Sequence, residues 1–534
     1  MTKSFSSHRP VIMGTNWMIS ADHPLAAQAG ATVLESGGNA VDAAVAANLV
    51  LAVVRPHMCG LGGDLFALIY QAQTGRLEVL NASGRSPYRA TRDHCLGLGL
   101  KVIPEDGLLT ATVPGAIDGW ESVLEKYGTR SLADLLPKAV SYAEKGFPVY
   151  PELVQAIEKR APALTKSPAA TKVFLRDGIP PKVGQRLVQA DLAESLRLLA
   201  AQGKDAFYRG HLGETLVRFS EKMSGLFGAK DLLDHTHTWT EPLKIDYKGL
   251  TVCTQPPNSQ GIALLMQMAI LENCGMTGLG HNTADYIHLL VEAKKLAFAV
   301  RDKYICDPDF HPVPVDFMLS AEQIRGQADR IDRLKAFSLV KPRDFSAGGK
   351  DTVYLAVVDQ EGNAVSLIQS LYEAFGSCVM IPETGIILHN RGRGFTLDPD
   401  HVNCLKPHKR PYHTLHSAMV LKEGRPFLVL GTPGADGQTQ TVTQVLMNQL
   451  EFGASVQEAV EAPRFRSNPD GSLLLEGRLN LEVVSGLKDR GHKVEVVSAW
   501  DGVMGSCQMI LIDRENKVML AGADPRRQAY AIGS

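Results

Sequence analysis

The chain has 534 residues, of which 45% are apolar and 21% are charged. These proportions are typical of a folded, water-soluble protein with a large buried core, and they exclude long disordered tracts. Lysine and arginine (55) nearly balance aspartate and glutamate (57), so the expected partner is a small molecule or another protein chain, not nucleic acid or an anionic membrane.

The first predicted elements are two helices. Residues 24–54 are rich in alanine, with apolar residues at helical spacing, and Ser36-Gly37-Gly38-Asn39 marks the end of the first helix. The second helix is largely apolar and must therefore be buried. A glycine cluster at 60–63 then leads into two β-rich runs joined by a turn at 73–75.

The middle of the chain, from about residue 115 to 345, has a mostly helical pattern with breaks at proline. One exception is segment 247–271, where a strand passes through Pro256-Pro257-Asn258-Ser259-Gln260-Gly261 into a helix. Such a junction presents backbone N–H groups to a cleft. Residues 339–350 are polar and contain glycine, so we expect this segment to be mobile.

Strands dominate the pattern after residue 350. Residues 351–371 predict two strands joined by a turn at 360–363, and residues 418–431 predict a further hairpin. A helix is expected from about Thr441 to Phe452. Strands and helices alternate in the remainder, which ends in a predicted strand.

The N-terminal sequence and the cysteines bear on location. The first 24 residues lack the apolar run of a secretory signal. No stretch of about 18 uninterrupted apolar residues, the length needed to span a bilayer, occurs in the sequence. The eight cysteines are scattered singly, and we interpret them as reduced thiols. A cytoplasmic location is therefore expected.

The junction between Asp351 and Thr352 is chemically the most informative point. A polar loop delivers Thr352 to the start of a predicted strand. A threonine hydroxyl is a poor nucleophile at neutral pH and needs a base beside it. Cleavage before Thr352 would create an α-amine, with a reference pKa of about 8, that serves as this base. In isolation, the pattern is far more typical of a threonine that only begins a strand.

Nine ordered segments resemble the γ-glutamyltranspeptidase family over nearly the whole chain. They are residues 37–46, 58–70, 256–261, 351–377, 385–390, 409–419, 431–437, 461–465 and 523–527. The resemblance implies an α/β (α+β) fold, the four-layer αββα sandwich of N-terminal-nucleophile hydrolases. It also implies an inactive precursor that cleaves itself into a large subunit, residues 1–351, and a small subunit, residues 352–534, which together form one core.

The resemblance assigns catalytic roles to four residues. Thr352 matches the nucleophile, and Ser370 matches a hydroxyl residue that supports the new amine, with serine in place of the usual threonine. Gly434 and Ala435 match the glycine pair whose N–H groups form the oxyanion hole, where loss of one donor costs roughly 3 to 4 kcal/mol. The implied reaction is acyl transfer through an ester on Thr352, with water or an amine as acceptor and no metal or organic cofactor.

The predicted substrate-binding residues depart from the family pattern. The arginine that grips the α-carboxylate is replaced by Ser83, and Arg85 follows two residues later. The aspartate that binds the α-ammonium is replaced within the run Arg391-Gly392-Arg393-Gly394. Arginine is well suited to bidentate carboxylate binding. We therefore expect a site that binds an ammonium group poorly and an extra carboxylate well, with Arg85, Arg391 and Arg393 as candidates.

Two further departures concern the same region. The family's paired serines are replaced by His413 and Thr414, and segment 396–408 is shorter than a long lid loop, which predicts an open cleft. These features resemble the branch with class IV cephalosporin acylases and oxamate amidohydrolase. The sequence thus leaves two substrate classes open. One is γ-glutamyl amides such as glutathione, and the other is oxamate- or glutaryl-type amides without γ-glutamyl preference.

The same sequence leaves other interpretations open. An uncleaved, non-catalytic scaffold is one alternative, and the processed unit is also compatible with a dimer. His389, His413 and His416 lack the spacing of a metal site, so no metal is predicted. Asp64 and Asp436 either assist catalysis or cap turns. The glycine clusters lack the spacing of a nucleotide-binding loop.

Overall fold

The computed structural model describes residues 6–276, 278–337 and 351–534, and its main feature is a pair of seven-stranded antiparallel sheets. Sheet A runs in the order β1 (Ile12–Gly14), β18 (Val518–Ala523), β17 (Gln508–Asp513), β13 (Arg425–Gly431), β12 (Ser417–Lys422), β9 (Leu250–Thr254) and β8 (Leu243–Tyr247). Sheet B runs in the order β19 (Tyr530–Gly533), β2 (Met18–Ala21), β10 (Asp351–Val358), β11 (Ala364–Tyr372), β3 (Asp64–Gln71), β4 (Arg76–Ala82) and β7 (Thr238–Thr240).

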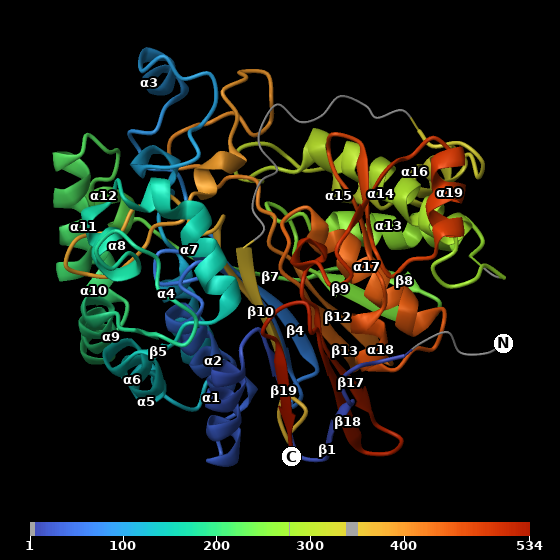
Figure 1. The fold of residues 1–534 in the computed structure, drawn as a ribbon, viewed down its shortest axis with the longest axis horizontal. Helices are drawn as coiled ribbons and strands as arrows, with labels where there is room; N and C mark the ends of the chain where they lie inside the picture. The colour runs from blue at the N-terminus through green and yellow to red at the C-terminus, as the bar shows by residue number, and fades with distance from the viewer. Residues whose placement is uncertain (1–5, 277, 338–350) are drawn as a thin grey trace.

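Helices cover the outer face of each sheet and complete four layers (Figure 1). Sheet B is covered by α1 (Pro24–Glu35), α2 (Ala40–Val54) and α4 (Ala116–Tyr127). Sheet A is covered by α13 (Ile262–Asn273), α17 (Gly437–Leu450) and α18 (Val456–Glu461). Behind α13 lies α14 (Ala284–Tyr304), which packs against α19 (Leu481–Asp489).

The remaining elements extend these layers. The helices beside sheet B are α3 (Arg92–Gly97), α5 (Leu132–Leu135), α6 (Pro137–Lys145), α7 (Pro151–Leu164), α8 (Pro168–Phe174), α9 (Ala190–Gln202), α10 (Asp205–Tyr208), α11 (His211–Lys222) and α12 (Ala229–Leu233). Those near α14 are α15 (Val315–Met318) and α16 (Ala321–Ala328). Two smaller sheets comprise β14 (Phe465–Ser467), β15 (Ser472–Glu476) and β16 (Lys493–Val497), and β5 (Phe147–Pro148) and β6 (Arg186–Leu187).

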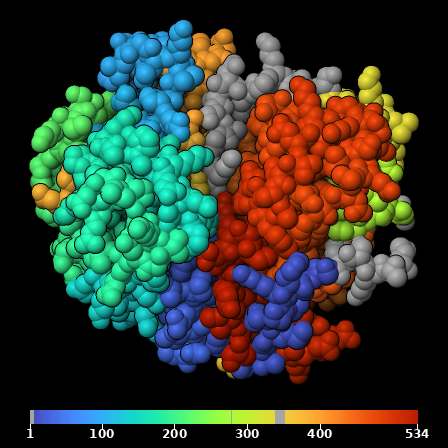
Figure 2. All heavy atoms as spheres, in the orientation of Figure 1, coloured from blue at the N-terminus to red at the C-terminus, as the bar shows by residue number. Residues whose placement is uncertain are grey.

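Three apolar cores fill the spaces between the four layers. Phe66, Ile368, Met419 and Val429 belong to the core between the two sheets, and each outer space has a core of its own. All residues of α2 are buried, which explains why its sequence is apolar on every side. Figure 2 shows that the N-terminal part of the chain, in blue to green, forms much of the left side of this face, opposite the C-terminal part in red.

The αββα fold expected from the sequence is confirmed. The two helices within residues 24–54 are α1 and α2, and Asn39 caps α2 through a reciprocal pair of hydrogen bonds with Asp42. The hairpin within 351–371 is β10–β11. The helix expected from Thr441 begins earlier, at Gly437, because the preceding turn runs directly into it. The expectation that 339–350 is mobile falls outside the described residues.

None of the helices formed by the described residues combines the length and the apolar character needed to cross a bilayer.

Candidate active site

Thr352 lies in sheet B at an irregularity between two neighbouring strands. It is the second residue of β10, and it is only 2% exposed. Asp351 pairs with Tyr372 on β11, but the next pair joins Val353 to Gln369. One residue of β10 therefore faces two residues of β11, an arrangement that re-aims side chains and occurs often beside active sites.

The Thr352 hydroxyl is the first member of a chain of hydrogen bonds. Its Oγ1 donates to the Oγ of Ser370 on β11 over 3.1 Å. Ser370 Oγ in turn donates to the carbonyl oxygen of Asp351 over 2.8 Å and accepts the N–H of Tyr372 over 2.7 Å. Because the Asp351 carbonyl belongs to the peptide bond before Thr352, both hydroxyls converge on the bond predicted to be cleaved.

The Gly434–Ala435 turn connects β13 to α17. Gly434 has φ 133° and Ala435 has φ 50°, so both lie where L side chains are rare. Placing the Ala435 methyl there costs on the order of 1 kcal/mol. Gln260 Nε2 holds the turn by donating to the Ala435 carbonyl over 2.9 Å and to the Thr414 carbonyl over 2.7 Å.

Arg301 of α14 supports this turn from behind. Its guanidinium is buried and donates to Gln260 Oε1 over 2.6 Å and to Asp436 Oδ1 over 2.8 Å. The hydroxyl of Tyr412 also donates to Gln260 Oε1, over 3.0 Å. Arg301 thus orients the Gln260 amide, whose nitrogen then faces the two carbonyls that it binds.

Arg391 is buried beside the strand that carries Ser370. Its Nε contacts Asp64 Oδ2 over 3.2 Å, and one terminal nitrogen donates to Thr414 Oγ1 over 3.2 Å. The guanidinium carbon lies 4.3 Å from the centre of the Tyr372 ring. The other terminal nitrogen has no hydrogen-bond partner among the described residues. A buried cation therefore has a donor left to bind another group.

Asp64 anchors Arg391 at the start of β3. Its carboxylate also accepts the N–H of Gly84 over 3.0 Å and contacts His413 Nε2 over 3.0 Å. Burial opposes ionisation, but His389, His413 and Arg391 together hold the pKa of Asp64 well below its usual range. Burial and Arg391 lower the pKa of His413 to about 3. Asp64 is therefore ionised and His413 neutral at physiological pH.

The tautomer of His413 follows from its partners. Its Nδ1 accepts the N–H of Leu415 over 3.2 Å, so the proton resides on Nε2 and is donated to Asp64. One negative charge on Asp64 thus faces one positive charge on Arg391, with neutral groups around them. An additional carboxylate would find its nearest counter-charge in Arg391.

The structure places two predicted substrate-binding residues outside this group of contacts. The Arg85 guanidinium contacts the Thr236 carbonyl over 3.3 Å and Asp309 over 3.4 Å. Arg393 is paired with Glu373, which also accepts a hydrogen bond from Asn390. The other predicted residues belong to one continuous set of contacts. Tyr372 links the Thr352–Ser370 pair to Arg391, and Asp64 links Arg391 to His413. Thr414 contacts Arg391 and is joined to the Gly434–Ala435 turn through Gln260.

Sequence reasoning identified the supporting residues of this site only in part, and Asp64 was named as a residue that either assists catalysis or caps a turn. Gln260 stands in the Pro256–Gly261 junction and Asp64 directly follows a glycine cluster, so both had a local signal. Tyr372 and Arg301 had none, since each occurs within an ordinary strand or helix pattern. Within the described ranges, His389, His413 and His416 form no group with metal-binding geometry.

The gamma-glutamyltranspeptidase family model matches residues 26–534. The chain is 42% identical to the glutathione hydrolase-like YwrD proenzyme of Bacillus subtilis (strain 168), over 98% of this chain and 99% of that protein. It is 36% identical to the oxamate amidohydrolase proenzyme of Klebsiella pneumoniae, over 98% of this chain and 99% of that protein.

A solved structure also matches the chain over its whole length. The crystal structure of cephalosporin acylase from Bacillus halodurans has a TM-score of 0.93 and 35% sequence identity to the chain. The match covers 100% of this chain and 98% of that one. Sequence and fold thus agree over the full length, and the chain belongs to the γ-glutamyltranspeptidase family as an enzyme.

Proposed function

We propose that the chain is an inactive precursor that cleaves itself before Thr352 and then works as an amidohydrolase or acyltransferase. The observation that carries this proposal is the hydrogen-bond chain from Thr352 through Ser370 to the Asp351 carbonyl. The Ser370 hydroxyl draws electron density from the carbonyl carbon that Thr352 must attack. Attack breaks the C–N bond and forms an ester on Thr352 Oγ1, which water then hydrolyses.

The second reaction uses the α-amine that cleavage creates. This amine takes the proton of Thr352 Oγ1 as the oxygen attacks a substrate amide, and it passes the proton to the leaving nitrogen. The N–H groups of Gly434 and Ala435 stabilise the oxyanion. Water or an amine then releases the acyl group from Thr352. In this scheme residues 1–351 and 352–534 act as the two subunits of one enzyme.

We assign the acyl group to a class that ends in a free carboxylate. Arg391 supports this, because a buried guanidinium with an unused donor is suited to bind a carboxylate by charge-assisted hydrogen bonds. The name of one relative, an oxamate amidohydrolase, points to the same class. Glutathione and other γ-glutamyl amides are the second candidate, favoured by the glutathione hydrolase-like relative.

Denaturing electrophoresis tests the self-cleavage. We expect two bands, with Thr352 as the first residue of the smaller fragment by N-terminal sequencing. A Thr352→Ala variant is expected to stay intact and inactive. Full activity in material that is uncut before Thr352 would refute the proposal, and an intact, inert wild-type chain would favour a scaffold.

A matched pair of substrates tests the acyl group. Glutaryl anilide and γ-glutamyl anilide differ only by the α-ammonium group, for which the described residues near Arg391 offer a carboxylate, Asp64, that is already paired. We expect a higher kcat/KM for the glutaryl compound, with oxamate as a smaller test amide. A much higher value for γ-glutamyl anilide would assign the chain to glutathione-type substrates.

A further inference from the structure

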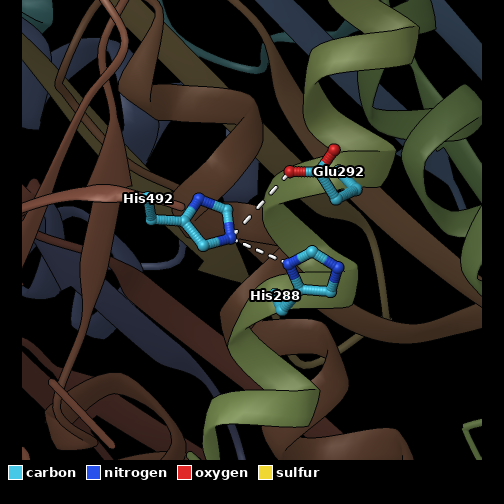
Figure 3. Close-up of side chains that lie close together, drawn as sticks. All are labelled: His288, Glu292 and His492. Carbon is cyan, nitrogen blue, oxygen red and sulfur yellow. Dashed lines mark hydrogen bonds and ion pairs between the residues drawn. The ribbon is translucent and has the colours of Figure 1, made fainter. Parts of the chain in front are cut away.

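Three buried side chains converge in the outer helical layer beside sheet A, apart from Thr352 in sheet B. His288 and Glu292 lie one turn apart on α14, and His492 lies just before β16. Figure 3 shows the three side chains pointing toward one another. One nitrogen of each histidine and one oxygen of Glu292 all lie within 4.8 Å of one another.

The hydrogen bonds determine which atoms of His288 are available. Its Nε2 lies 2.7 Å from the carbonyl oxygen of Asp332, which can only accept, so Nε2 carries the proton. His288 Nδ1 therefore presents a lone pair. This lone pair lies 2.8 Å from Nε2 of His492, which must donate in the metal-free chain.

Glu292 completes the group with one oxygen oriented by the backbone. Its Oε2 accepts the N–H of Phe337 over 3.0 Å. Its Oε1 lies 3.9 Å from His492 Nε2 and accepts a hydrogen bond from Lys295 Nζ over 2.7 Å. Lys295 also donates to the Phe337 carbonyl over 3.2 Å. Oε1 keeps a second lone pair that is available to an ion between the three side chains.

We propose that His288, Glu292 and His492 bind one divalent transition-metal ion, with Zn²⁺ the best match. Two imidazoles and one carboxylate form a common zinc ligand set, with Zn–N distances of about 2.0–2.1 Å and an open fourth position for water. Tetrahedral binding places the two nitrogens about 3.3 Å apart, a few tenths of an ångström more than in this structure. On binding, neutral His492 changes tautomer: its Nε2 gives up the proton to water and its Nδ1 takes one up, so that the Nε2 lone pair can bind the ion.

The contacts around the three ligands resemble the supports of a metal site. The Asp332 carbonyl fixes the tautomer and ring orientation of His288, as partners of metal-bound histidines commonly do. Asp332 and Phe337 belong to the last described stretch before residue 351. The ion therefore joins α14 and the residue before β16, and the partners of its ligands lie in this stretch.

The test uses the full-length protein, stripped with a chelator and titrated with Zn²⁺ or Co²⁺ alone. We expect one ion per chain by calorimetry, and Co²⁺ absorption bands typical of four- or five-coordinate sites. His492→Ala and Glu292→Gln are expected to lower the affinity at least tenfold. His211→Ala, which changes an exposed histidine on α11, is the matched control and should bind as the wild type does.

Lys295→Gln is a variant for which we expect the affinity for Zn²⁺ to rise instead of fall. It removes a cation bonded to the ligand oxygen, so we expect tighter Zn²⁺ binding, by several-fold. Circular dichroism and the thermal midpoint without metal report whether each variant is folded. The proposal is wrong if folded wild-type protein shows no Co²⁺ bands at several-fold excess of metal, or if His492→Ala and Glu292→Gln both bind as the wild type does.

Discussion

Ser370 is placed to act on the bond before Thr352, because its hydroxyl donates to the Asp351 carbonyl. We expect Ser370→Ala to slow self-cleavage by about 10²- to 10³-fold, the usual loss when a donor to a developing oxyanion is removed. Ser370→Thr should retain most of the rate. The measurement is the fraction of intact chain over time on denaturing gels.

The control for this variant is another buried serine of β11. Ser366 Oγ bonds the Tyr354 hydroxyl over 2.7 Å and makes no contact with Asp351. Ser366→Ala should therefore be cleaved at the wild-type rate. Equal rates for Ser370→Ala and the wild type would remove Ser370 from the processing step.

Arg391 and Arg393 are close in sequence but differ in environment. The first has an unused donor, whereas the second is paired with Glu373. We expect Arg391→Met to lower kcat/KM for glutaryl anilide by about 10- to 100-fold, since hydrogen bonds to charged groups contribute about 1.5–3 kcal/mol. Arg393→Met should change it less than threefold. The reverse order of the two effects would assign the substrate carboxylate to Arg393.

At the scale of elements, the junction between β9 and α13 supports the turn between β13 and α17. Gln260 at this junction binds the Ala435 carbonyl, which keeps the turn in its left-handed conformation. We expect Gln260→Met to lower kcat about 10- to 100-fold with little change in KM, because it displaces an oxyanion donor.

Gln267 provides the matched control on α13. It is buried like Gln260, but among the described residues its side-chain nitrogen bonds only the Ala263 carbonyl of its own helix. Gln267→Met is expected to keep the wild-type kcat. If Gln260→Met raised KM and left kcat unchanged, Gln260 would bind substrate and would not position the turn.

The elements that the sequence predicted are those with a local signal. Helices α1 and α2 and the hairpins β10–β11 and β12–β13 follow from periodicity and turn residues within the segments themselves. Strands β1, β2 and β19 have only three or four residues each. Their partners lie far along the chain, so no local pattern reveals them.

In the candidate site, too, the residues that stand in a sequence motif were predictable, and the contacts that depend on packing were not. Thr352 and Ser370 stand in a motif, and the structure brings them within hydrogen-bond distance. Arg85 was selected for its closeness in sequence to a family position, yet its side chain reaches Thr236 and Asp309. The bond between Arg301 and Gln260 depends on how α14 packs against α13, which a helical pattern does not encode.

At the scale of the whole molecule, buried histidines make stability depend on pH. Burial is the largest cause that lowers the pKa of His23, His57, His413 and His416 to about 3 each. The unfolded reference is about 6.5, so between these values the unfolded chain binds protons that the folded chain does not. The contribution of these histidines to stability is thus fully present above about pH 6.5. It is lost toward pH 3, with a slope of about 1.4 kcal/mol per pH unit for each histidine.

The pH dependence that Asp22 contributes to stability is opposite to that of the histidines. Burial raises its pKa to about 6, so its contribution falls as the pH rises from about 4 to 6. Burial also raises the pKa of Glu121, Asp231, Asp351 and Asp359, which act in the same direction as Asp22. His492, whose pKa burial lowers to about 3, acts with the four histidines, as do Asp64 and Glu152, whose pKa values lie below their usual range. We expect the urea midpoint of the full-length protein to be lower at about pH 5 than at about pH 7. An equal or higher midpoint at the acidic pH would show that the imidazoles are not neutral in the folded chain.

The order of strands has a consequence for the proposed cleavage before Thr352. In sheet B, β10 lies between β2 and β11, and β11 lies beside β3; in sheet A, β18 lies beside β1 and β12 beside β9. Strands that precede the proposed cleavage site therefore lie beside strands that follow it in both sheets. Dilution alone should not release the fragments, and gel filtration should show them travelling together until denaturant melts the sheets.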